Sequence, residues 1–149
     1  LRSAGAQEAK LLVVAVDQPD KTLAIIQTAQ KHFPHLKILV RTLDRRHTYE
    51  VMKLGVTAYQ RETFESALEL GVQTLQTLGL TADDARSTAN TFRAHDEESV
   101  EVLADLWGDD KSYGVAARQR LDDLSQVLAA DRDSDSTADD QIELSPARE

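Results

Sequence analysis

The sequence has 149 residues, of which 41% are hydrophobic and 29% are charged, enough for one ordinary domain and an appendage. Its formal net charge of -9 argues against nonspecific nucleic-acid binding, and the absence of cysteine excludes disulfides, thiol chemistry and the usual zinc sites. No apolar run approaches the roughly 20 residues of a membrane helix, and no signal peptide is recognisable. Because the chain begins Leu-Arg-Ser and not with methionine, we expect a segment of a longer protein.

The stretch from Lys10 to Asp17 is a short, unbroken apolar run that stops on one carboxylate. A strand buried on both faces loses the alternation of a half-exposed strand, so the run predicts a central parallel strand. Pro19 follows two residues later and disfavours a helix through this point. The carboxyl end of such a strand is where an open α/β sheet presents its ligand.

Strands and helices are predicted to alternate from here to Gly79. The expected elements are a helix from Pro19 to Phe33, a strand from Leu36 to Leu43, a helix from Arg45 to Leu54 with Asp44 as N-cap and Gly55 as C-cap, a short edge strand from Val56 to Tyr59, and a helix from Arg61 to Gly79. Three strands are few for a doubly wound sheet. We therefore expect the α/β fold class, with residues 1–79 forming the C-terminal half of a Rossmann-like doubly wound parallel sheet.

The rest of the chain is predicted to be a helical appendage, residues 80–130, that serves as a dimer contact. Thr81-Ala-Asp-Asp84 has a capping-box pattern at its start, Trp107-Gly108 interrupts it, and a helix from Tyr113 to Ala130 follows. Residues 131–149 contain almost nothing apolar and are expected to be a disordered acidic tail.

Three charged residues are candidates for function from their positions alone. Asp17 closes a strand, where an aspartate serves either as a turn or cap residue or as a polar contact to a ligand. Arg41 lies in an apolar strand, and it either pairs with a carboxylate or phosphate or is solvated at the strand end. Arg61 opens a helix whose dipole does not favour a cation, whereas Glu62 is explained by that dipole.

No catalytic machinery is predicted. The four histidines have no spacing that suggests convergent metal ligands, and no nucleophile stands beside a base. The chain also contains no G-x-G-x-x-G, so a complete nucleotide site cannot be built from it alone.

An ordered set of short motifs now carries a family resemblance. The motifs are Ala4-Gly5-Ala6, Val14-Ala-Val-Asp17, His32-Phe-Pro-His35-Leu, Arg41 with Asp44, Gly55-Val56, Arg61-Glu-Thr-Phe64-Glu and Leu78-Gly-Leu80. Together they resemble the cytosolic KTN or RCK (TrkA-N type) regulatory domain of Kef-like, glutathione-regulated potassium-efflux antiporters. The resemblance covers about residues 1–106.

The resemblance implies a dimeric Rossmann-like domain that regulates a monovalent cation:proton antiporter. AMP or NAD(H) would be the regulatory nucleotide, bound only with the preceding half of the domain, through the backbone of Val16 and Asp17 and through Arg41. Arg61 matches an arginine of the glutathione pocket, and Asp96 stands where the family has an asparagine, which adds a negative charge against an anionic peptide. The implied partners are a second copy, a membrane antiporter domain in the same parent chain, and glutathione or its conjugates, with no nucleic acid. The implied location is the cytoplasmic face of a bacterial inner membrane.

Two other functions fit the residues less well. The chain could be the distal half of an NAD-dependent dehydrogenase, although no proton-transfer residue stands out. It could also be a dimerisation module that binds no ligand, which predicts no nucleotide affinity even when the preceding half is present.

Overall fold

The computed structural model describes residues 5–142, with the side chains of residues 5–130. The chain divides into two compact units, Leu1–Ala67 and Leu68–Glu149, and each is described by itself. The boundary falls in the first turn of helix α3 (Phe64–Thr77).

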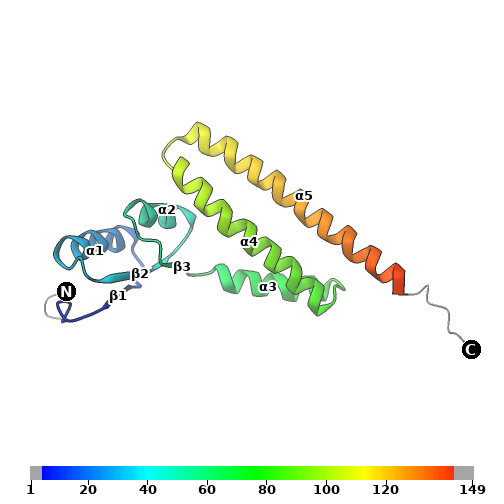
Figure 1. Ribbon diagram of the computed structural model, residues 1–149, viewed down its shortest axis with the longest axis horizontal. Helices are drawn as coiled ribbons and strands as arrows, with labels where there is room; N and C mark the ends of the chain where they lie inside the picture. The colour runs from blue at the N-terminus through cyan, green and yellow to red at the C-terminus, as the bar shows by residue number, and fades with distance from the viewer. Residues whose placement is uncertain (1–4, 143–149) are drawn as a thin grey trace, which may run out of the picture. The chain divides into compact units, whose positions relative to one another are not determined.

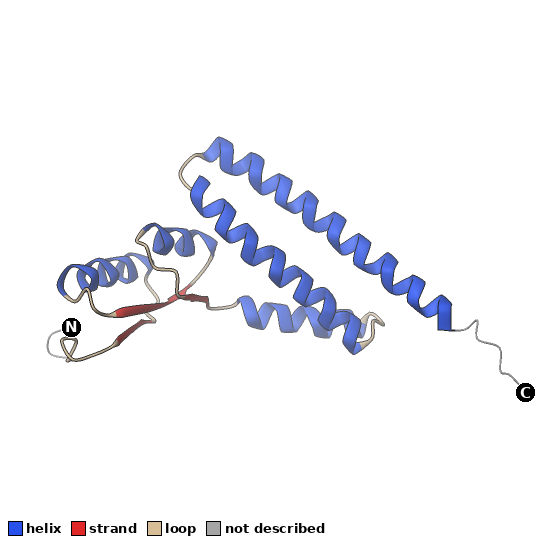
Figure 2. Ribbon diagram, in the orientation of Figure 1, coloured by secondary structure: helices blue, strands red, loops and turns tan. Residues whose placement is uncertain are grey.

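The first unit is built on a three-stranded parallel sheet in the order β1-β2-β3 (Figure 2). Its strands are β1 (Leu11–Val14), β2 (Lys37–Thr42) and β3 (Tyr59–Arg61). Helices α1 (Pro19–His32) and α2 (Arg45–Lys53) connect them and lie on the same face of the sheet (Figure 1). This arrangement confirms the parallel α/β class that the strand–helix alternation predicts.

The core of this unit lies between one face of the sheet and the two helices. Alternate residues point to the same face of a strand, so Val14 and Val40 meet Ile26 of α1 and Val51 of α2. Val56 closes the cluster after α2. These five side chains are at most 5% exposed, and the helices are held by this apolar stripe.

The prediction of a central strand buried on both faces stays a prediction for β1. The strand covers Leu11–Val14 and lies at the edge of the described sheet. Leu11 is 51% and Val13 is 56% exposed, because α1 and α2 cover only the face that carries Leu12 and Val14. The apolar run shows that both faces suit burial, but it does not say what covers the second face.

Local sequence signals fix most of the helix ends. Asp44 caps α2, its Oδ1 accepting a hydrogen bond from the His47 N–H at 2.8 Å. α3 ends in a Schellman motif in which Gly79 has φ +106° and the Leu80 N–H donates to Leu75 O at 3.1 Å.

The region between β3 and α3 differs from the prediction. The last strand is Tyr59–Arg61, later than the expected Val56–Tyr59, and α3 begins at Phe64. Arg61 therefore ends a strand instead of opening a helix. The Glu62 N–H continues the β2–β3 pairing by donating to Thr42 O at 2.9 Å, which removes Glu62 from the helix whose dipole was expected to explain it.

The second unit contains most of α3 together with α4 (Ala82–Leu106) and α5 (Asp110–Ile142), which run side by side as a helical hairpin (Figure 1). Thr81 caps α4 as the capping-box pattern predicts, with its Oγ1 accepting from the Asp84 N–H at 3.1 Å. At the turn between α4 and α5, Trp107 and Tyr113 pack edge to face with ring centroids 5.5 Å apart.

The last helix extends beyond the segment expected for it. The compact units meet at residues 67/68, whereas the domain boundary at 79/80 stays a prediction. α5 begins at Asp110 and continues to Ile142, into the segment expected to be a disordered tail, and residues 143–149 of that segment lie outside the described residues. Across the described part of the chain, no helix is long and apolar enough to cross a membrane.

Candidate functional site

The carboxyl end of the sheet brings three of the predicted site residues together. Val16 follows β1 and packs half-buried against the core, which fixes the backbone of the turn that leads into α1. The next residue, Asp17, has a side chain that is 88% exposed. Asp17 is therefore held at the edge of the sheet with its carboxylate in solvent.

Arg41 lies between two carboxylates at this edge. Its Nη2 is 2.5 Å from Asp17 Oδ1, and its Nη1 is 3.7 Å from Glu62 Oε1. Its side chain is 30% exposed, and its buried Nε has no hydrogen-bond partner among the described residues. Of the alternatives open from sequence, Arg41 is paired with carboxylates.

The strands position this group, which we call the edge triad: Asp17, Arg41 and Glu62. Asp17 follows β1, Arg41 is the fifth residue of β2, and Glu62 follows β3, so the three lie at the carboxyl ends of neighbouring parallel strands. With one cation and two anions, the triad carries a formal charge of -1. An anionic ligand at this edge would therefore meet a group with a net negative charge.

The N-terminus of α2 lies next to the same edge, but its own residues occupy it. Besides the Asp44 cap, the Leu43 N–H donates to His47 Nδ1 at 3.2 Å, which leaves the proton of the neutral ring on Nε2. That Nε2 is buried without a hydrogen-bond partner among the described residues. Burial lowers the pKa of His47 below its ordinary value, against a smaller opposing effect of the Asp44 carboxylate.

Arg61, the last residue of β3, stacks on an aromatic ring. Its guanidinium carbon lies 3.7 Å from the centroid of the Phe64 ring, a cation–π arrangement that holds the side chain in place. Phe64 opens α3 three residues later, so the turn from β3 into the helix creates the contact.

Asp96, the other residue predicted for a glutathione pocket, belongs to the second unit. It is 3% exposed on α4, on the face that also buries Ser99 and Val100. The structure brings Asp17 and Arg41 together, whereas Arg61 and Asp96 belong to different units.

A polar cluster between α4 and α5 was missed from sequence. Arg120 of α5 has a side chain 18% exposed, its Nε donates to Ser99 Oγ at 3.0 Å, and its Nη2 lies 2.8 Å from Glu98 Oε2. The Ser99 hydroxyl donates to His95 O at 2.6 Å. Hydrogen bonding and charge from Arg120 lower the pKa of Glu98. The available signal was that Arg120 falls in the apolar stripe of α5, four residues before Leu124.

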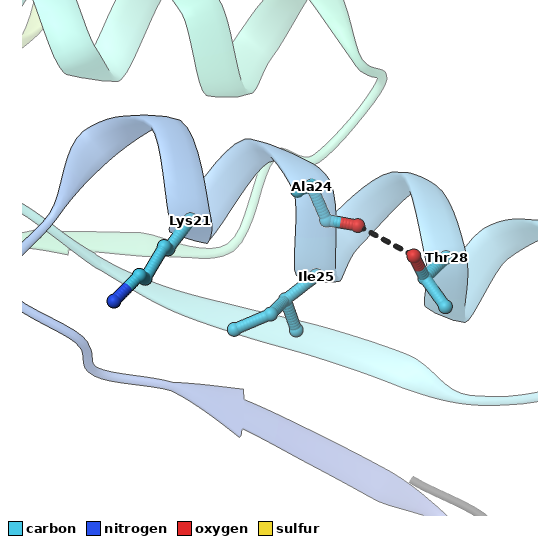
Figure 3. A pocket seen from close by; sticks show the side chains of 4 residues that line it. All are labelled: Lys21, Ala24, Ile25 and Thr28. Atoms are coloured by element: carbon cyan, nitrogen blue, oxygen red, sulfur yellow. Dashed lines mark hydrogen bonds between the residues drawn. The ribbon is translucent and has the colours of Figure 1, made fainter.

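One shallow depression of about 280 Å³ lies on α1, away from the edge triad (Figure 3). It is lined by one face of that helix, with Ile25 and the Lys21 stem beside Ala24 and Thr28, and the Thr28 hydroxyl is turned to Ala24 O at 2.7 Å. Its lining has one charged group and no second element, which does not make a site for a polar ligand. Among the side chains of residues 5–130, no three of His, Asp or Glu are grouped to hold a metal ion.

Family models match both units of the chain. Residues 1–61 match the TrkA-N domain, and residues 66–142 match the potassium efflux system KefB C-terminal domain. The two matches meet close to the boundary between the compact units at 67/68.

Individual relatives agree with the family models. Glutathione-regulated potassium-efflux system proteins KefC from Klebsiella pneumoniae and Klebsiella aerogenes are each 39% identical over 133 residues, which is 89% of this chain and 21% of theirs. The chain thus spans about a fifth of the length of these relatives. A solved structure described as Shewanella denitrificans Kef CTD in AMP bound form is 49% identical to this chain, with a TM-score of 0.71. The match covers 72% of this chain and 68% of the chain in that structure. The chain therefore belongs to the family of potassium-efflux system KefB C-terminal domains.

Proposed function

We propose that this chain is the nucleotide-sensing regulatory part of a Kef-type potassium:proton antiporter. The observation that carries the proposal is the edge triad at the carboxyl ends of parallel strands, where α/β sheets bind ligands, in a chain 49% identical to a Kef domain described as AMP-bound. The nucleotide, AMP or NAD(H), would contact the backbone of Val16 and Asp17, and Arg41 would act by holding the Asp17 carboxylate.

The transport function belongs to the rest of the parent protein in this proposal. The aligned residues make up only 21% of the KefC relatives, and the membrane antiporter domain would lie in the remaining length. The domain would form a homodimer at the cytoplasmic face of a bacterial inner membrane. Nucleotide binding would bias the transporter only through a difference in affinity between its two states.

A second ligand, glutathione or its conjugates, is proposed for Arg61 and Asp96. The name of the KefC relatives supports it, as does the stacking of Arg61 on Phe64, which presents a pre-organised guanidinium for a carboxylate. Asp96 acts against it, because a buried carboxylate in place of an amide repels an anionic peptide. We therefore expect weaker glutathione binding than an asparagine at position 96 would give.

The test is calorimetric titration of AMP, NADH and glutathione into the full-length protein. We expect AMP to bind, and Arg41→Ala to weaken AMP roughly tenfold because Asp17 loses the charge-assisted contact that holds it in place. Lys31→Ala, which removes an exposed cation of the same unit at the other end of α1, should leave AMP affinity unchanged.

The glutathione arm uses two variants with opposite expected effects. Arg61→Ala should abolish glutathione binding, and Asp96→Asn should strengthen it. If none of the three ligands binds, the sensor proposal is wrong and a dimerising module remains. A parent chain without any membrane-spanning segment would refute the antiporter assignment.

A further inference from the structure

The two carboxylates of the edge triad are not suited to bind the phosphate of a nucleotide, and they fit another part of it. Arg41, the cation that a phosphate would seek, already has Asp17 Oδ1 at 2.5 Å and Glu62 Oε1 at 3.7 Å. A phosphate would have to displace Asp17 and approach a group with a formal charge of -1. The charge balance at this edge therefore disfavours an anion.

Asp17 itself has the properties of a fixed hydrogen-bond acceptor. Only its Oδ1 is held by Arg41, and the side chain is 88% exposed. The ionised carboxylate has no donor proton, so its outer oxygen can only accept. Arg41 fixes the direction of that acceptor, which lowers the entropy lost when a donor binds.

The position of Asp17 places this acceptor beside the expected ligand. The chain moves in one direction across the sheet, from β1 to β2 to β3, with α1 and α2 on one face. We expect the preceding half of the sheet on the free side of β1, which places there the reversal at which doubly wound sheets bind ligands. Among the triad residues, Asp17 follows the strand closest to that side.

We propose that Asp17, held by Arg41, accepts a hydrogen bond from a neutral donor of the nucleotide, a ribose hydroxyl or the base amine, and that the phosphate binds elsewhere. This inference rests on the proposed function, because it assigns part of the nucleotide to one residue of that site. Arg41 is then a positioning residue and Asp17 the residue that contacts the ligand.

The experiment compares AMP with 2′-deoxy-AMP, 3′-deoxy-AMP and IMP, which lacks the base amine, by calorimetry on the full-length protein. Asp17→Asn is the test variant, since its amide oxygen turns to Arg41 and its NH₂ then meets the donor of the ligand. We expect Asp17→Asn to weaken AMP roughly tenfold. The loss of affinity caused by Asp17→Asn should disappear for one of the three analogues, 2′-deoxy-AMP, 3′-deoxy-AMP or IMP. The group that this analogue lacks is then the donor.

Two further variants separate this effect from a general change in charge or fold. Glu8→Gln removes one negative charge from an exposed position at the opposite, amino end of β1 and should leave all four affinities unchanged. Arg41→Lys should weaken AMP in the wild-type background, but not further in the Asp17→Asn background, because it acts through Asp17.

Each remaining outcome overturns the inference. An equal loss for all four ligands, or no loss, would mean that Asp17 contacts no donor. Tighter AMP binding by Asp17→Asn would mean that the phosphate faces the carboxylate. Failure of the wild-type protein to bind AMP would overturn the proposed function, and this inference with it, whereas the other outcomes leave AMP binding intact.

Discussion

The hydrogen bond between Arg120 and Ser99 should be a main polar stabiliser of the α4–α5 hairpin. Arg120→Met removes the guanidinium and keeps most of the apolar stem that packs along the helix. Ser99→Ala removes the acceptor on the other helix, and the double variant completes a thermodynamic cycle. The cycle isolates the pair from the second hydrogen bond of Ser99 to His95 O.

The expected coupling is about 1.5 kcal/mol. Hydrogen bonds with a charged partner contribute about 1.5–3 kcal/mol, and the lower end applies because the Arg120 side chain keeps some solvent contact. Each single variant should lower the free energy of unfolding by a similar amount, and the double variant by clearly less than the sum. The Glu98 ion pair adds little, since Glu98 is mostly exposed.

The assay is urea unfolding followed by tryptophan fluorescence. Trp107 is the only tryptophan in the sequence and packs on Tyr113 at the α4–α5 turn, so it reports on this unit. Glu101→Gln, an exposed change on α4, serves as the control and should leave the midpoint unchanged. A coupling below about 0.3 kcal/mol, within the error of additive sites, would refute the reasoning.

Three further changes test the local structure. Thr81→Ala should lower the free energy of unfolding by about 1 kcal/mol through loss of the α4 N-cap, with Thr81→Ser close to wild type, again measured by Trp107 fluorescence. Gly79→Ala should cost about 1–2 kcal/mol because φ is +106° there, although no atom blocks the new Cβ, and an unchanged midpoint would contradict the Schellman end. Because the folded state lowers the pKa of His47, the unfolded state takes up its proton first as pH falls through about 6.5. The free energy of unfolding should therefore be greatest above that pH and fall below it. His47→Asn, which keeps a side-chain acceptor, should reduce the slope of this free energy against pH, measured by circular dichroism between pH 5.5 and 7.5. Equal slopes for the variant and the wild type would refute this.

Much of the candidate site could be predicted because its residues follow strands. Asp17 was identified at the end of one strand and Arg41 inside the next, and parallel strands bring their carboxyl ends to one edge. Glu62 was assigned to a helix instead, because the sequence does not show that its N–H pairs with Thr42 O and prolongs the sheet. The pairing of Arg41 with carboxylates depended on the tertiary contacts with Asp17 and Glu62, which lie on either side of it in the sheet.

The sequence by itself determined the elements and their class. Apolar runs of strand length, stripes at helical spacing, the Asp44 and Thr81 caps and the glycine after α3 are local signals, and each lies within a few residues of the element that it specifies. Only the tertiary structure decided which face of β1 is covered, that Arg41 joins Asp17 and Glu62, and that Arg120 crosses from α5 to Ser99. The contacts of Arg41 and Arg120 join residues 21 to 24 positions apart, and no local propensity encodes a partner at that distance.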